Sequence, residues 1–160
     1  MVGDGPYRNY IEKIKPKNLF IIGYLKGEKL AKSYSNSDIF LFPSETETYG
    51  LVVLEAMASG LPVIVSNKGA AHEHIEHNKS GFITETEEEY LKYIDLLINN
   101  ENIKTKISKE AFYTAQRLNL EKTYLQYINE IFFNREKNNE DIRHYHLLPQ
   151  KEWRNKEIYR

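Results

Sequence analysis

Several features that direct a protein toward particular partners or compartments are missing from this sequence. It has no cysteine, so it can form neither a disulfide framework nor a thiolate metal site. No apolar run approaches the roughly 20 residues that a membrane-spanning helix needs. The 22 Lys and Arg residues nearly balance 23 Asp and Glu residues, which leaves no basic excess to bind phosphates of nucleic acids. The N-terminus lacks a secretory pattern. We therefore expect a cytoplasmic protein without a nucleic-acid partner.

The first half of the chain alternates between short apolar runs and helical patterns. The runs, which predict buried strands, cover residues 19–22, 39–42, 62–65 and 81–83. The segments with helical spacing between them cover residues 7–14, 28–34, 50–59 and 70–77. This alternation is typical of βαβ units, so we predict an α/β fold: a Rossmann-like parallel sheet with helices on both faces.

The second half has a different character. From Thr86 onward three amphipathic patterns predict C-terminal helices, and the last of them includes Tyr124 and Phe132. The charged, weakly periodic sequence that follows predicts a tail that is disordered in isolation. We therefore predict one domain at 1–133 and a tail at 134–160.

The stretch Pro43–Ser66 contains the most unusual local pattern. Two carboxylates, Glu47 and Glu55, are separated by seven residues, and Gly50 lies between them where a helix should begin. The helix is apolar almost all round, which predicts burial. Glu55 is its only charge, and a buried charge requires a partner.

This pattern fits a ligand that combines an anion with hydroxyl groups. Loops at the carboxyl ends of parallel strands bind ligands, and free N–H groups at a helix N-terminus favour an anion such as phosphate. Gly50 has no Cβ to keep a ligand from the backbone. Glu55 lies roughly 7 Å further along the helix axis. Ionised carboxylates accept hydrogen bonds from hydroxyls, so a diphosphate with a sugar on one side and a ribose on the other would fit.

Simpler explanations exist for each residue. Glu47 could be a surface acid near a helix start, Glu55 could pair with a core Arg or Lys, and Gly50 could serve only as a turn residue. His72, His74 and His77 lie near Glu73 and Glu76, but these offsets do not share one helix face. We therefore expect a solvated helix start there and no metal site.

The motif ETYGLVVLEAMASGLPVIVS resembles the donor-binding domain of the retaining glycosyltransferases of family 4 (group 1), which have the two-domain GT-B fold. The resemblance extends through VGDGP, NLFIIGYL and YSNSDIFLFPS on one side and SGFI on the other. It is dense from Val2 to about Ile83. The local sequence SETETYGLVVLEAMASGLPV is especially similar to that of lipid-glycosylating members such as sulfoquinovosyl-diacylglycerol synthases.

The resemblance implies a role for each matching position. Glu47 would be the catalytic-site carboxylate that accepts hydrogen bonds from the donor sugar. The donor sugar and phosphates would contact Glu47, Thr48, Tyr49, Gly50 and Leu51, the last three largely through backbone N–H groups. The nucleoside would contact Glu55 through its ribose hydroxyls and the main chain at Gly23, Tyr24 and Leu25 through its base. The donor would be a UDP-, GDP- or ADP-sugar, and no other cofactor is implied. Because no Asp-x-Asp occurs, no metal is indicated.

Two family features have no counterpart in this sequence. The Arg/Lys pair that contacts the diphosphate would fall before Met1, and Arg8 and Lys68 match neither residue. The N-terminal acceptor domain, which would meet an acceptor glycan or lipid, has no match either. The resemblance thus implies a glycosyltransferase of hexosyltransferase type, incomplete here, and we expect this chain alone to be inactive. The acceptor domain would be its partner, and a lipid acceptor would imply peripheral association with the inner face of a membrane. The alternatives are a non-catalytic nucleotide-sugar-binding module and, less favoured, a GT-B epimerase.

Overall fold

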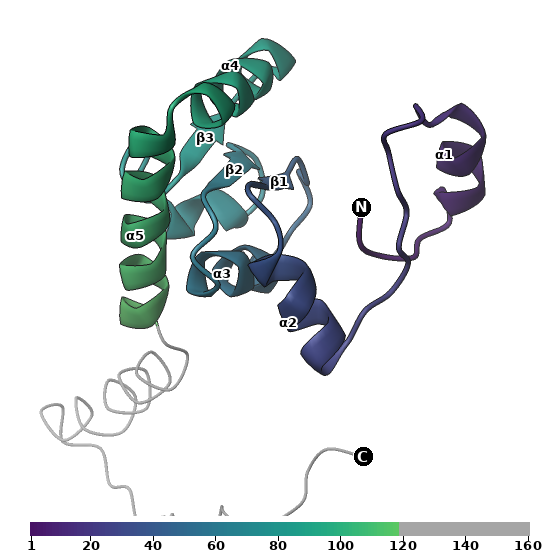
Figure 1. The fold of residues 1–160 in the computed structure, drawn as a ribbon, viewed down its shortest axis with the longest axis horizontal. Coiled ribbons are helices and arrows are strands. Elements are labelled where there is room, and N and C mark those ends of the chain that lie inside the picture. Colours follow the sequence, from purple (N-terminus) through teal and green to yellow (C-terminus); the bar gives the residue numbers. More distant parts are fainter. Residues whose placement is uncertain (119–160) are drawn as a thin grey trace, which may run out of the picture. The chain divides into compact units, whose positions relative to one another are not determined.

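The computed structural model describes residues 1–118, and Figure 1 shows how their helices and strands are arranged. The elements follow in the order α1 (Arg8–Ile14), α2 (Gly27–Ser35), β1 (Phe40–Phe42), α3 (Leu51–Ala58), β2 (Val63–Ser66), the 3₁₀ turn η1 (Ala71–His74), β3 (Phe82–Thr84), α4 (Glu87–Asn99) and α5 (Glu101–Arg117). None of the helices within residues 1–118 is long and apolar enough to cross a membrane. The predicted helix around Tyr124–Phe132 and the predicted tail 134–160 lie outside the described residues.

Strand β2 is the centre of a three-stranded parallel sheet with the order β1-β2-β3. Phe40 of β1 lies opposite Val63, and Ile64 lies opposite Phe82 of β3. All four residues of β2 are buried, as a near-continuous apolar strand must be when a parallel sheet is covered on both faces. The predicted fold class is therefore confirmed.

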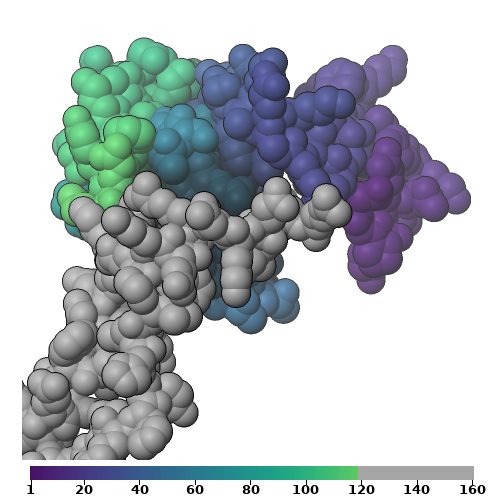
Figure 2. Space-filling model, turned by 90° about the horizontal axis from the view of Figure 1, so that it is seen from below, coloured from purple at the N-terminus to yellow at the C-terminus, as the bar shows by residue number. Residues whose placement is uncertain are grey.

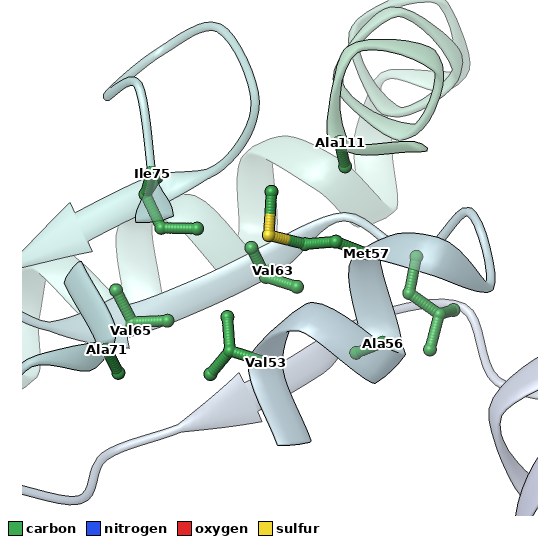
Figure 3. Close-up of a cluster of buried hydrophobic side chains, with 9 residues drawn as sticks. Val53, Ala56, Met57, Val63, Val65, Ala71, Ile75 and Ala111 are labelled. Atoms are coloured by element: carbon green, nitrogen blue, oxygen red, sulfur yellow. The ribbon is translucent and has the colours of Figure 1, made fainter. Parts of the chain in front are cut away.

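Alternate residues of β2 pack into two separate hydrophobic clusters. On one face, Val63 and Val65 pack with Val53 and Met57 of α3, and Figure 3 shows these side chains pointing toward one another. On the other face, Ile64 packs with Leu97 of α4 and with residues of β3 and α5. Helix α5 also packs against α3, and its surface lies beside that of the α3 region in Figure 2. The sheet is thus enclosed by helices, and the loop from β1 to α3 emerges at its edge.

The prediction of a buried strand at residues 19–22 is wrong. Residues 19–22 form no strand, and the isolated parallel bridge next to them joins Val2 to Gly23. Phe20 and Ile22 are 68% and 58% exposed, because no layer of described residues covers this segment on both sides as β2 is covered. An apolar run favours a buried strand only when neighbouring elements supply those layers.

The expectation that α3 is buried on all sides is also wrong. Val53, Ala56 and Met57 are buried, but Leu51 is 47% exposed and Glu55 is exposed as well. Helix α3 packs on β2 through one face only, so the apolar residues of its other face reach the surface. Glu55 therefore needs no buried counter-charge.

Candidate functional site

The candidate site begins in the loop between β1 and α3, where Glu47 folds back on its own backbone. Its Oε1 atom accepts hydrogen bonds from the N–H groups of Thr48 at 3.0 Å and Tyr49 at 3.4 Å. The N–H groups of Tyr49, Gly50 and Thr48, in decreasing order of effect, hold the pKa of Glu47 below its usual range. An ionised carboxylate therefore lies on the N–H groups that precede α3, as expected where a loop enters a helix N-terminus.

Gly50 is required at the start of α3, but the physical reason differs from the predicted one. Its φ of +81° lies in the left-handed region that favours glycine. A Cβ on Gly50 would lie 2.9 Å from both Cα and Cβ of Ala71. The missing Cβ makes room for the chain's own turn η1, and the predicted close approach of a ligand to the Gly50 backbone stays a prediction.

The segment after β2 holds the Glu47 loop in place. The N–H of Ala70 donates to the carbonyl of Glu47 at 2.9 Å. Gly69, with φ of +70°, brings its backbone so close that a Cβ would lie 3.1 Å from the backbone N and O of Glu47. Lys68 adds an exposed ion pair with Glu45, with 2.8 Å between Nζ and Oε1. Two loops at neighbouring strand ends therefore form one packed unit.

Glu55 lies one turn further along α3 and faces a different environment. Its Oε2 atom accepts a hydrogen bond of 3.0 Å from the hydroxyl of Tyr34 in α2. Burial, the hydrogen bond to Glu55 and the charge of Glu55, in that order, raise the pKa of the Tyr34 phenol well above its ordinary value. Tyr34 therefore stays protonated and donates to Glu55 at neutral pH.

A cavity of about 680 Å³ opens beside Glu55 and Tyr34. Two of the residues predicted to contact the nucleoside, Tyr24 and Leu25, line the same cavity, whereas Gly23 does not. Much of the remaining lining is apolar: Val2, Leu19, Ile22, Leu30, Ile39, Phe40, Leu41, Phe42 and Val52. Glu55 and Tyr34 thus place polar groups in a largely apolar hollow, the usual composition of a small-molecule site.

The structure gathers the predicted residues into two groups, one at the start of α3 and one in its second turn. Glu47, Thr48, Tyr49, Gly50 and Leu51 form the loop and helix start, and Glu55, Tyr24 and Leu25 line the cavity. Gly23 lies just outside, where its carbonyl accepts a hydrogen bond of 2.8 Å from the Gly3 N–H. The N-terminal N–H groups of α3 lie between the two groups. Gly50, the N-cap, has no side chain that could accept hydrogen bonds from them.

Sequence reasoning missed three residues that position this site. Nothing in the sequence context of Tyr34 indicates its bond to Glu55. Gly69 is recognisable as a turn residue, but its contact with Glu47 spans two loops. His74 was expected to be solvated, yet its Nε2 atom contacts the carbonyl oxygen of Tyr49. His77 is also engaged, since its Nδ1 atom accepts from the Ile83 N–H at 3.0 Å.

Arg8 and Lys68, the cations named above, are held in ion pairs. Arg8 pairs with Asp4, with 3.3 Å between Nη1 and Oδ2, as Lys68 pairs with Glu45. Within residues 1–118, no three side chains of the metal-binding types lie close enough to hold a metal ion.

The family model described as glycosyl transferases group 1 matches residues 1–113. The chain belongs to this family. Sulfoquinovosyl transferase SQD2 of Arabidopsis thaliana is 43% identical over 86 residues, which are 51% of this chain and 17% of that protein. Alpha-monoglucosyldiacylglycerol synthase of Acholeplasma laidlawii is 31% identical over 116 residues, 69% of this chain and 29% of the relative.

Solved structures of group 1 glycosyltransferases and related proteins have the same fold. HepE of Anabaena, crystallised with UDP, matches with a TM-score of 0.71 at 23% identity over 83% of this chain and 40% of that one. The C-terminal domain of LpcC from Francisella tularensis, a group 1 glycosyl transferase, matches with a TM-score of 0.59 at 26% identity over 68% of this chain and 58% of that one. The chain spans less than a third of the length of the two curated relatives above.

Proposed function

We propose that this chain is the donor-binding part of a retaining glycosyltransferase that transfers a glycosyl group from a nucleotide sugar to an acceptor. The observation that carries the proposal is the pair of carboxylates that flank the start of α3. Glu47 lies on the N–H groups before the helix, and Glu55 lies in the cavity with Tyr24 and Leu25. Glu47, the N–H groups at the start of α3 and the cavity beside Glu55 offer, in this order, environments suited to a sugar, a diphosphate and a nucleoside.

On the sugar side, Glu47 accepts hydrogen bonds from hydroxyls of the donor sugar, with Thr48 and Tyr49 alongside it. Its lowered pKa supports this role, because only the ionised carboxylate is purely an acceptor. The N–H groups at Gly50 and Leu51 hold the phosphate oxygens and stabilise the negative charge that develops on the departing diphosphate. Since the sequence has no Asp-x-Asp, we propose that donor binding requires no metal.

On the nucleoside side, Glu55 binds the ribose hydroxyls, and the main chain at Tyr24 and Leu25 contacts the base. An ionised carboxylate offers about four lone-pair sites, so the bond from Tyr34 leaves acceptors for a ribose. Gly23 supports this segment through its bond to Gly3, and its own contact with the base stays a prediction. The UDP complex of HepE favours a UDP-sugar among the UDP-, GDP- and ADP-sugars expected.

We propose that catalysis also requires an acceptor domain and that the donor-binding part alone is inactive. The relatives named sulfoquinovosyl transferase and alpha-monoglucosyldiacylglycerol synthase favour a lipid acceptor, and with it peripheral membrane association. The second candidate function is a non-catalytic nucleotide-sugar-binding module. It is favoured by the ion pairs that Arg8 and Lys68 form with Asp4 and Glu45, because a paired cation is not directed at a diphosphate.

Calorimetric titration of the chain with UDP-, GDP- and ADP-sugars tests donor binding. Glu55→Ala should weaken binding by about 10- to 100-fold, because hydrogen bonds to a charged group contribute about 1.5–3 kcal/mol. The control is Glu28→Ala, which removes an exposed carboxylate that pairs with Lys32 and does not line the cavity. Binding by Glu55→Ala equal to that of the unmodified chain would overturn the ribose assignment. Glycosyl transfer by the chain alone would contradict the proposal that it is inactive.

A further inference from the structure

His74, the last residue of η1, makes two contacts with Tyr49 in the Glu47 loop. Its Nε2 atom lies within hydrogen-bond distance of the Tyr49 carbonyl oxygen. Its ring also meets the ring of Tyr49 edge-on, with 4.8 Å between centroids and 66° between planes. A carbonyl oxygen only accepts hydrogen bonds, so Nε2 must carry the hydrogen and donate it.

The bond to the Tyr49 carbonyl also fixes the next N–H group. In a trans peptide the C=O and the following N–H point in opposite directions within one plane, and residues 1–118 contain no cis peptide. With the Tyr49 carbonyl directed at His74, the Gly50 N–H is directed to the opposite side of the loop. Glu47 lies there, and the Gly50 N–H is among the groups that lower its pKa.

The orientation of this peptide is not set by backbone sterics alone. Gly50 has no Cβ, so the peptide before it can rotate between orientations that other residues would forbid. Ala71 restricts the space beside the Gly50 Cα, but no hydrogen bond between Ala71 and the Gly50 N–H is present to direct that N–H. A side-chain donor on the carbonyl oxygen supplies the missing restraint.

We propose that His74 is a positioning residue that holds the Tyr49 carbonyl and thereby keeps the Gly50 N–H directed at the anion-binding side of the Glu47 loop. Loss of the donor frees the peptide to rotate, and one of the N–H groups that stabilise negative charge there is lost. The consequence for donor phosphates rests on the proposed function. The effect on the Glu47 carboxylate does not.

Two substitutions separate the hydrogen bond from the ring contact. His74→Phe keeps an aromatic ring against Tyr49 but has no donor, whereas His74→Gln keeps an N–H donor without the ring. The readout is the titration of the Glu47 carboxyl group by NMR in the full 160-residue chain. His74→Phe should raise the pKa of Glu47 toward its ordinary value, and His74→Gln should keep it low.

Either of two results would contradict the positioning role: a Glu47 titration in His74→Phe equal to that of the unmodified chain, or an equal shift in both variants. A merely structural role would lower the melting temperature without this difference. If His74→Phe does not fold, His74→Ala takes its place, because it removes the donor without adding volume.

Donor affinity of the same variants tests the consequence for ligands. His74→Phe should weaken nucleotide-sugar binding by about 3- to 10-fold, the effect of one hydrogen bond, and His74→Gln should restore it. If the unmodified chain binds no nucleotide sugar, the proposed function fails, and the Glu47 titration still decides the role of His74. If the chain binds and His74→Phe binds equally well, the positioning consequence fails alone.

Discussion

The loop that carries Glu47 and the segment that carries Tyr24 and Leu25 are held in place by different means. The Glu47 loop packs against residues 69–74 through two glycine contacts and hydrogen bonds from Ala70 and His74. The segment before Tyr24 is bound mainly by backbone contacts with residues 1–3, such as the 2.9 Å bond from the Ile22 N–H to the Met1 carbonyl.

This difference predicts how substitutions in the two regions would affect the stability of the protein. The Glu47 loop is continuous with the buried sheet, so its geometry is preorganised and a substitution there should cost stability. In the segment before Tyr24, apolar side chains such as Phe20 and Ile22 are largely exposed. Regions with few buried contacts open at low free energy, so substitutions there should leave global stability nearly unchanged.

The largest expected effect comes from the buried face of α3. Met57→Ala should lower the free energy of unfolding by about 2–5 kcal/mol, because it removes a fully buried side chain and leaves a cavity. The matched substitution in the N-terminal segment, Phe20→Ala, should change it by less than about 0.5 kcal/mol. Urea denaturation of both variants measures the contrast, and equal losses would mean that the two regions are equally well packed.

The next largest effect distinguishes backbone strain at Gly50 from a steric clash with Ala71. Gly50→Ala and Gly60→Ala both place alanine at a left-handed φ, +81° and +77°, which costs about 1–2 kcal/mol. Only Gly50 has a neighbour, Ala71, within 4 Å of the added Cβ. Gly50→Ala should therefore be less stable than Gly60→Ala by a further 1–3 kcal/mol or so.

Unfolding free energies of these two variants, measured in urea, give the difference directly. If they destabilise equally, the contact between Gly50 and Ala71 does not restrain the loop.

The smallest expected effect concerns Tyr34 and Glu55. Tyr34→Phe removes the hydroxyl that donates to Glu55 and should cost about 0.5–1 kcal/mol at pH 8. The pKa of Tyr34 is raised in the folded chain, so this contribution is complete below the unfolded value of about 10. It is lost as pH rises through the folded value.

The cost of Tyr34→Phe should therefore be smaller at pH 11 than at pH 8, measured by urea unfolding at each pH. Tyr10→Phe, at a 60% exposed tyrosine, is the control and should change stability at neither pH. The same cost for both variants would show that the bond to Glu55 does not matter.

Much of the fold was predictable because local patterns agreed with the tertiary arrangement. The apolar runs at β1, β2 and β3 are flanked by helical patterns, and the structure confirms the parallel sheet with helices on both faces. The roles of Glu47 and Glu55 stay predictions. The same periodicity was misleading at residues 19–22, since burial depends on the layers around a strand and not on its own composition.

The sequence by itself determined the family, the parallel sheet and the positions of two carboxylates around a helix start. These follow from residue order, because Gly50 begins the helix and spacing along α3 places Glu55 beyond it. Only the tertiary structure decided that Glu55 is exposed and bound to Tyr34, and that Glu47 lies on its own loop. It also decided that His74 and Ala71 shape that loop. The contacts of Glu55 with Tyr34, of Tyr49 with His74 and of Gly50 with Ala71 join segments 20 or more residues apart, whose approach depends on how the strands pair and the helices pack.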